Sequence, residues 1–188
     1  MQSIRSSSNY TVQLFKQNYF ELFDIPASFH VDQELLIGRY RDLQSQWHPD
    51  RFASGSEQQK LQAVQVSSLL NQAFDTLRTP LVRAGYLLTL KQCDIERVSQ
   101  QDLGMELLME QMQLRETLED LPVDDSALAA LDALKERVNS KLQVSEQAFA
   151  KHLGADAILD AKKSYHELQF LVKLLREIEI GEEQRLDY

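Results

Sequence analysis

Three kinds of residue are scarce in this chain: cysteine, glycine and proline. Its 188 residues include one cysteine, six glycines and four prolines. The single cysteine, Cys93, cannot form an internal disulfide, and no cluster of cysteines and histidines has the spacing of a metal site. So few glycines and prolines disfavour a turn-rich all-β fold. We therefore expect no metal, no other cofactor, and a reducing compartment, the cytoplasm.

Two further absences limit the partners. No apolar run approaches the roughly 18 residues that a membrane span needs, and residues 1–17 lack the apolar centre of a signal peptide. Positive charge is also scarce, since the formal net charge is −9. Residues 18–92 hold 7 Lys and Arg against 8 Asp and Glu, whereas residues 93–188 hold 11 against 21. We expect neither a membrane nor a nucleic acid as partner, and two units that bind different partners.

The first half has the apolar spacing of a helical hairpin. A short apolar segment is halted by Pro26, and Asp32 has the position of an N-cap for a helix that Pro49 stops. Ser56 and Gln59 have capping-box spacing at the start of a second long helix. The apolar faces of these two helices are Leu36, Tyr40, Leu43 and Trp47, and then Ala63, Val66, Leu70, Ala73, Phe74 and Leu77.

A short helix and a linker separate this hairpin from the rest of the chain. Thr79 and Pro80 suit the N-cap and the first position of the short helix, and residues 91–102 are polar without helical periodicity. We therefore predict an all-α chain with two domains. The predicted parts are residues 1–17, a disordered extension or a segment left by cloning; 18–90, a helical domain; 91–102, the linker; and 103–188, a three-helix bundle.

The second domain is predicted to be an antiparallel three-helix bundle, because the connections between its helices are short. The helices are expected at about 103–120, 125–152 and 156–180. Gly154 has the position of a left-handed C-cap for the second of them. The seam of the third helix is predicted to be Ile158, Ala161, Tyr165, Leu168, Val172 and Leu175.

The segment WHPDRF carries the most distinctive chemistry, with His48 and Asp50 on either side of Pro49. Four roles fit such a pair: a catalytic dyad, a metal site, a helix-ending turn with solvated side chains, or a docking tip for another protein. Side chains on either side of a proline usually point apart, and no nucleophile motif accompanies them. The pattern therefore disfavours catalysis and metal binding, and it leaves the turn and the docking tip open.

Three separated motifs in the first half resemble those of a J domain. They are YFELFDIP, a helix that ends in QWHPDRF, and LNQAFDTLRTP, and their order and spacing match over residues 18–80. The hallmark of that family is a His-Pro-Asp tip between its second and third helices. More narrowly, HPDRFASGSEQQ, LNQAFDTLRTPLVRAGYLL and the acidic second half are similar to the HscB family, the J-type co-chaperones of bacterial iron–sulfur cluster assembly. This resemblance extends over essentially the whole chain after residue 17.

The resemblance implies two protein partners and no enzymatic activity of the chain's own. The chain would stimulate the ATPase of a DnaK-type, HscA-like chaperone and deliver an IscU-like iron–sulfur scaffold protein to it, assisting cluster assembly and transfer. The basic face that the family presents to the chaperone is thin here, because Asp42 lies beside it. The residues implied to contact the chaperone are His48, Pro49 and Asp50, with Arg39, Arg41 and Arg51 for electrostatic steering.

The first helix of the bundle has two apolar faces when residues are placed at about 100° intervals. A second apolar face is either covered within the bundle or meant for a partner, and helical geometry alone leaves both open. Phe170, in the last helix, is placed roughly opposite the predicted seam. The core face is Leu103, Leu107, Leu114, Leu118 and Leu121, and the opposite face is Met105, Met109, Met112 and Glu116, with Leu108 at its flank.

The HscB resemblance implies that the second face binds the scaffold protein. The chain departs from the family at Gln113, where an acid is usual, and at Met112, where leucine is more typical. Two rival hypotheses stay open: a helical enzyme that uses His48 and Asp50, and a J protein that serves a different client through the same bundle. The residues carried over for scaffold binding are Leu108, Met109, Met112 and Phe170, with Glu116 and Asp120 at an acidic rim.

Overall fold

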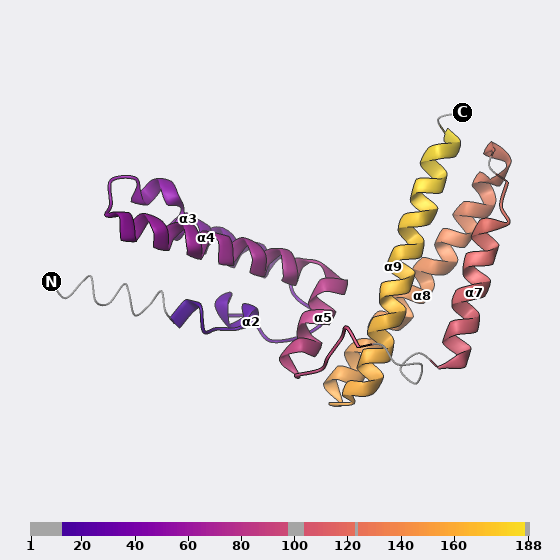
Figure 1. Cartoon of the computed structure of the whole chain (residues 1–188), viewed down its shortest axis with the longest axis horizontal. Helices are drawn as coiled ribbons and strands as arrows, with labels where there is room; N and C mark the ends of the chain where they lie inside the picture. Colours follow the sequence, from indigo (N-terminus) through magenta and orange to yellow (C-terminus); the bar gives the residue numbers. More distant parts are fainter. Residues whose placement is uncertain (1–12, 98–103, 123, 187–188) are drawn as a thin grey trace. The chain divides into compact units, whose positions relative to one another are not determined.

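All elements in the described part of the chain are helices (Figure 1). The computed structural model describes residues 13–97, 104–122 and 124–186. The chain forms two compact units, Met1–Arg83 and Ala84–Tyr188. The predicted all-α fold is therefore confirmed, and the two units are described separately below.

A short helix in the first unit is capped at its N-terminus by local side chains. Helix α2 (Tyr19–Leu22) is capped by Asn18, whose side-chain oxygen accepts from the backbone N–H groups of Phe20 and Glu21, each at 3.0 Å. The Glu21 carboxylate accepts from the Asn18 N–H at 2.9 Å, which completes a capping box. Both ends of the first turn are thus hydrogen-bonded by local side chains.

Helices α3 (Gln33–Trp47) and α4 (Glu57–Arg78) run side by side as a hairpin (Figure 1). The predicted caps are confirmed: Asp32 accepts from two backbone N–H groups at 3.0 Å, and Ser56 forms a capping box with Gln59. Leu36 is fully buried, whereas Tyr40, Leu43 and Trp47 are half-buried. The predicted face of α4 is confirmed by its buried residues, Ala63, Val66, Leu70, Ala73 and Leu77.

Aromatic and polar contacts hold the two hairpin helices together beyond the apolar core. The rings of Tyr40 and Phe74 stack with their centroids 4.2 Å apart, and the Tyr40 hydroxyl donates to Asn71 Oδ1 at 2.9 Å. Tyr40 therefore contributes its ring to the interface and its hydroxyl to a hydrogen bond at the edge of the interface.

Arg83 ties the loop before α3 to the end of α4. Its Nε donates to the Phe29 carbonyl at 2.7 Å, another guanidinium nitrogen donates to the Leu77 carbonyl, and the guanidinium carbon lies 5.3 Å from the centre of the Phe29 ring. Arg83 is buried, and burial of a cation is costly unless its donors are paired. These contacts let the hairpin keep a buried charge.

Three helices end in the same way, with a residue other than glycine in the left-handed region. Asp24, Gln92 and Asp156 have φ values of 52°, 58° and 56°. Each follows the C-cap of its helix, and the backbone hydrogen bonds there form the pattern of a Schellman motif. After α8, Asp156 N donates to the Leu153 carbonyl at 3.1 Å and Ala157 N to the His152 carbonyl at 2.9 Å.

The prediction that Gly154 is a left-handed C-cap is wrong. Gly154 is the last residue of α8 (Leu128–Gly154), and Asp156 takes the left-handed conformation two residues later. An aspartate tolerates this region better than most residues, and its carboxylate also lies 2.7 Å from Lys91 Nζ. The polar side chain therefore replaces the expected glycine.

The expected disordered extension, residues 1–17, is wrong for its last five residues. Residues 1–12 lie outside the described part, but residues 13–17 are ordered, and Leu14 is only 4% exposed. A single leucine followed by Phe15 gives no periodicity that could predict this packing. Burial of one leucine side chain contributes about 1.5–3 kcal/mol, which helps to hold a short segment in place.

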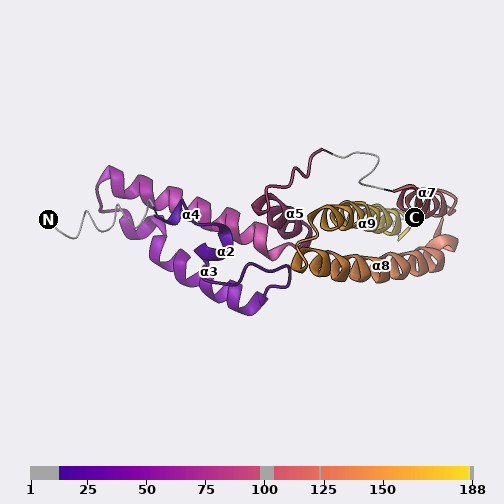
Figure 2. The same ribbon diagram turned by 90° about the horizontal axis from the view of Figure 1, so that it is seen from below.

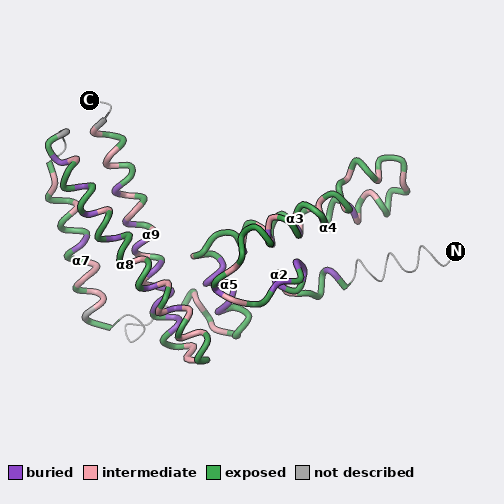
Figure 3. Tube along the Cα trace, turned by 180° about the vertical axis from the view of Figure 1, so that it is seen from behind, coloured by how far each residue is buried: buried purple, intermediate pink, exposed green. Residues whose placement is uncertain are grey.

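In the second unit, α7 (Met105–Glu119), α8 and α9 (Ile158–Leu186) alternate in direction as an antiparallel bundle (Figures 1 and 2). A short turn, η2 (Asp125–Ala127), leads into α8. Buried positions follow the facing sides of α8 and α9 (Figure 3). One cluster of buried apolar residues joins all three helices of this bundle: Leu114, Leu131, Leu134, Val138, Leu171, Leu174 and Ile178.

The predicted seam of the last helix is correct at its first half and shifts in its second half. Ala161, Tyr165 and Leu168 are buried as predicted, but Val172 and Leu175 are half-buried, while Leu171 and Leu174 are fully buried. Leu171 and Leu174 belong to a buried cluster that also includes Leu114 of α7 and Leu131 of α8. The packing of α7 and α8 on this part of α9 therefore decides which of its residues are buried, and a repeat along α9 alone does not predict it.

The division between the units falls inside α5 (Pro80–Leu90), earlier than the predicted domain boundary at residue 90. Ala84, Leu87 and Leu88 are buried, and a Cβ atom on Gly85 would lie 3.0 Å from the Tyr165 hydroxyl. The backbone of α5 thus packs closely on α9, a contact that local sequence cannot reveal. The functional domain limits stay a prediction.

A substitution of a buried residue in α9 tests the core that is assigned to the bundle. Leu171→Ala should lower the free energy of unfolding by about 2–5 kcal/mol, because it removes a fully buried side chain and leaves a cavity. Leu159→Ala is the matched control, since Leu159 lies on the same helix and is 70% exposed; its effect should stay within about 0.5 kcal/mol. Urea unfolding followed by circular dichroism measures both, and equal losses would contradict the assigned core.

Candidate functional site

The His-Pro-Asp segment joins α3 to a short 3-10 turn, η1 (Pro49–Phe52). His48 is at once the C-cap of α3 and the N-cap of η1, with φ −61° and ψ 130°. A residue before proline is held in this extended region, because the proline ring clashes with a helical neighbour. The predicted stop at Pro49 is therefore confirmed, and part of the expected loop is a turn of helix.

The His48 ring caps the turn that follows it. Its Nδ1 accepts a hydrogen bond from the Asp50 backbone N–H at 3.3 Å, and it lies 3.5 Å from Asp50 Oδ2. Nδ1 is thus the acceptor, which places the proton of the neutral ring on Nε2. The two side chains are closer than the sequence predicted, because the 3-10 turn brings residue 50 back toward residue 48.

This geometry does not match a catalytic dyad. In a His–carboxylate dyad, Nδ1–H donates to the carboxylate at about 2.6–3.2 Å. Here Nδ1 accepts from a backbone amide, and the carboxylate of Asp50 is 90% exposed to solvent. The arrangement presents a carboxylate and the Nε2 side of an imidazole to a partner.

Three neighbouring contacts make the tip rigid. The rings of Trp47 and Phe52 stack with their centroids 5.9 Å apart, and an Arg51 guanidinium nitrogen donates to the Ser45 carbonyl at 2.9 Å. A Cβ atom on Gly55 would lie 2.9 Å from Gln59 Oε1, so the loop closes tightly against α4. The tip itself is largely exposed, as the burial colours show (Figure 3).

The three arginines predicted to steer the chaperone do not form one patch. Arg39 pairs with Asp24 at 3.0 Å, about three turns before the tip, and Arg51 is held against the end of α3. Arg41 is exposed on α3. The structure therefore places Arg51 in the tip and leaves Arg39 and Arg41 further back along the helix.

A second candidate surface lies on α7. Met105, Met109 and Met112 are 74%, 57% and 62% exposed, whereas Leu114 on the other side of the same helix is 1% exposed. The prediction of two apolar faces on this helix is therefore confirmed. Leu107, Leu118 and Leu121 are half-buried, and Leu103 lies outside the described residues.

A groove of about 520 Å³ runs between this outer face of α7 and α9. Leu108 and Phe170 are half-buried. Phe170 also packs against the bundle core, so the prediction that it lies opposite the seam is only partly right. The described residues that line the groove are Met105, Leu108, Met109, Gln111, Met112, Arg115, Phe170 and Lys173.

The groove brings together the four predicted apolar residues but neither residue of the predicted acidic rim, and it includes residues that the sequence missed. Glu116 and Asp120 are exposed on α7 but are not among the described residues that line the groove. Arg115 and Lys173 do line it. Each stands three residues after a predicted site residue, Met112 or Phe170, so helical spacing could have found both.

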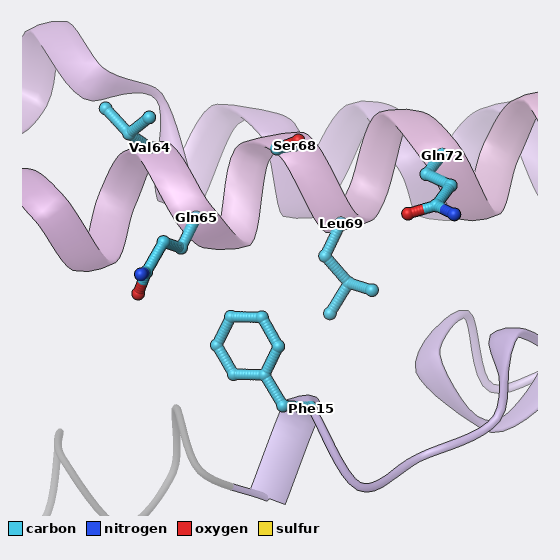
Figure 4. Close-up of a pocket in the computed structure, with 6 residues that line it drawn as sticks. All are labelled: Phe15, Val64, Gln65, Ser68, Leu69 and Gln72. Carbon is cyan, nitrogen blue, oxygen red and sulfur yellow. The ribbon is translucent and has the colours of Figure 1, made fainter.

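A separate apolar groove of about 700 Å³ lies between the segment before α2 and the outer face of α4 (Figure 4). The Phe15 ring points toward α4, near Gln65 and Leu69 (Figure 4). Val64 is half exposed and lies off the buried face of that helix. The sequence did not predict this surface, because residues 1–17 are predicted to lie outside the folded domain. Its lining is Phe15, Val64, Gln65, Ser68, Leu69 and Gln72.

Over residues 13–97, 104–122 and 124–186, no group of three or more His, Cys, Asp and Glu side chains is arranged to hold a metal ion. No helix in this part of the chain has both the length and the apolar character to cross a membrane.

Comparisons with known proteins cover both helical units. Residues 103–179 match the family described as the HSCB C-terminal oligomerisation domain. The co-chaperone protein HscB homolog of Vibrio atlanticus (strain LGP32) is 40% identical over 167 residues, which are 89% of this chain and 98% of that protein.

Two solved structures have the same arrangement of helices. Chaperone HscB from Vibrio cholerae matches with a TM-score of 0.80 and 38% identity, over 89% of this chain and 99% of that one. The human co-chaperone protein HscB matches with a TM-score of 0.80 and 28% identity, over 87% of this chain and 81% of that one. With identity of this level over nearly the whole of a relative, the chain belongs to the HscB family of co-chaperones.

Proposed function

We propose that the chain is an adaptor co-chaperone that assists iron–sulfur cluster assembly and transfer. Its first unit stimulates the ATPase of a DnaK-type, HscA-like chaperone, and its second unit delivers an IscU-like scaffold protein to that chaperone. The observation that carries the proposal is the rigid, exposed His48-Pro49-Asp50 tip, in a chain that belongs to the HscB family. The protein itself hydrolyses nothing, and it acts in the cytoplasm.

The tip supports chaperone binding because its recognition groups are held in place before the partner arrives. The Asp50 carboxylate is an acceptor for an arginine or a backbone N–H of the partner, and His48 offers a ring N–H. The stacked Trp47 and Phe52 rings and the Arg51–Ser45 hydrogen bond restrict the tip. Little conformational entropy is then lost on binding, which favours affinity.

The apolar groove on α7 supports scaffold binding. Monomeric proteins rarely expose a row of large apolar side chains, and three methionines with Leu108 and Phe170 form such a row here. Methionine side chains adapt to the shape of a bound surface. A chain with both sites raises the local concentration of the scaffold at the activated chaperone, which is the physical basis of an adaptor.

Two substitutions in the tip test the chaperone partner. Asp50→Asn and His48→Gln should each abolish stimulation of the HscA-like ATPase, because they remove the carboxylate charge and the imidazole while the helices stay intact. Turnover of ATP by the chaperone is measured with each variant, and circular dichroism checks the helical content. Asp75→Asn, an exposed acid on α4 near the end of the hairpin away from the tip, is the matched control and should stimulate normally.

Normal stimulation by both tip variants would contradict the proposed role of the tip. If the wild-type chain alone showed a hydrolytic activity that both variants lost, the rival hypothesis of a helical enzyme would take its place.

A double substitution tests the scaffold partner. Leu108→Ala with Phe170→Ala should weaken binding of the IscU-like scaffold by about 2–4 kcal/mol, because apolar anchors in the centre of an interface dominate its binding energy. Isothermal titration calorimetry measures the affinity. Phe170 also contacts the core, so Met112→Ala is a second groove variant that leaves the core untouched.

Val144→Ala is the control for this experiment, since Val144 is an exposed apolar residue on α8 and does not line the groove. Unchanged scaffold binding by the double variant and by Met112→Ala, with the fold retained, would contradict the proposal. Tight binding of another client by the wild-type chain would then favour the rival J protein.

A further inference from the structure

We infer that the groove on the outer face of α4 is the docking site of the chain's own N-terminal segment, residues 1–12, whose apolar side chains cover the exposed apolar residues of that helix. The inference concerns neither the His-Pro-Asp tip nor the groove on α7, so it does not depend on the proposed function. It is carried by the way in which the described residues just before α2 pack on the hairpin.

The segment directly before α2 contacts both helices of the hairpin. Leu14 is 4% exposed and lines a pocket together with Leu22 of α2 and Leu43 of α3. The next side chain, Phe15, lines the groove on α4, and its ring points toward that helix (Figure 4). The beginning of the described chain is therefore fixed across the hairpin, with one side chain directed to each helix.

Phe15 covers only one side of the groove. Its ring lies near Gln65 and Leu69 (Figure 4), and the residue is itself 48% exposed. Val64, which lines the same groove, is 52% exposed. Apolar side chains that gather in a groove and remain half exposed indicate a surface that another element covers.

The apolar surface of α4 continues one turn further toward the His-Pro-Asp tip. At about 100° per residue, Leu61 lies in the middle of the arc, about 140° wide, that the groove-lining residues of α4 occupy. This arc is nearly opposite the buried face of α4, and Leu61 is 59% exposed. The surface to be covered therefore runs over about 12 Å of helix, from Leu69 to Leu61.

The chain enters the described part from the side of the tip. Along the length of the hairpin, the described segment before α2 lies closer than α2 to the end where α3 joins α4 (Figures 1 and 2). Leu61 and Val64 stand in the half of α4 that begins at this end. Twelve residues span up to about 40 Å when extended, which is more than the length of this surface requires.

The composition of residues 1–12 suits the groove. None of the described residues that line the groove is charged, and its polar members are two glutamines and a serine. The segment MQSIRSSSNYTV is rich in uncharged polar residues and has one charged side chain, Arg5. Its apolar side chains are Met1, Ile4, Tyr10 and Val12. An uncharged groove with an apolar floor matches such a segment better than it matches a strongly charged partner.

The covalent connection favours this occupant over a separate protein. Tyr10 precedes Phe15 by only five residues, and a short tether gives an effective concentration of about 1 mM. A contact of a few apolar side chains with a Kd of about 0.1 mM is then about nine-tenths occupied. A free partner at micromolar concentration does not reach this occupancy with the same contact.

Thiol labelling tests the docking in the full chain. Cys93 is the only cysteine, so Val64→Cys in a Cys93→Ser background places a single thiol in the groove. Replacing Ile4, Tyr10 and Val12 together by serine should raise the rate of its reaction with a maleimide about tenfold, because a groove nine-tenths occupied leaves the thiol accessible about one-tenth of the time. Leu61→Cys is a second reporter and should respond in the same direction.

Two controls separate docking from other effects. Val144→Cys, at an exposed position on α8, should react at the same rate with and without the three serines. Gln2→Ser with Asn9→Ser alters the same segment without removing an apolar side chain, and it should leave the rate at Val64→Cys unchanged. Circular dichroism checks that every variant keeps its helical content.

The protection of the groove thiol should stay constant over a roughly hundredfold range of protein concentration, because the segment belongs to the same chain. Equal labelling rates with and without the three serines, at both Val64→Cys and Leu61→Cys, would overturn the inference. Protection that rises with protein concentration would also overturn it, since a second copy of the chain would then fill the groove.

Discussion

The tip of the α3–α4 hairpin depends on one backbone constraint, the exclusion of a residue before proline from the helical region. Pro49 holds His48 at ψ 130°, so α3 must end at Trp47. From that point the chain turns into η1, and His48 can cap the turn through its ring while Trp47 stacks on Phe52. The shape of the proposed chaperone site thus follows from the position of Pro49. The stacking of Trp47 on Phe52 and the hydrogen bond from Arg51 to Ser45 then restrict the conformation of the turn.

The second unit is under a different physical constraint: its fold must stay stable although one apolar surface remains exposed to solvent. Helix α7 buries Leu114 in the bundle and leaves its methionines on the other side. The long pairing of α8 with α9 forms a core that keeps the bundle folded while the methionines of α7 stay exposed. Phe170 belongs to both, since it packs on the core and lines the groove. The groove is therefore supported by a rigid helix on one side and by an adaptable row of side chains on the other.

Much of the fold could be predicted from local sequence. The N-caps Asp32 and Ser56 and the stop at Pro49 depend on neighbouring residues alone, and the structure confirms them. The errors have another origin. Gly154 was expected to be left-handed, but Asp156 has that role, and Leu14 was left out of a core that it joins. Both depend on contacts with residues that are distant in sequence or on where a helix finally ends.

The candidate sites divide in the same way. The sequence by itself determined that His48, Pro49 and Asp50 stand at a helix end and that α7 has two apolar faces, because proline stereochemistry and helical periodicity act over a few residues. Only the tertiary structure decided that Nδ1 of His48 accepts from Asp50, and that Arg115 and Lys173 share Glu177 beside the groove. The first relation depends on how the turn after Pro49 closes, which the residue types do not specify. The second depends on how α9 packs against α7, and the free energy of that packing is a sum over contacts between residues far apart in the sequence.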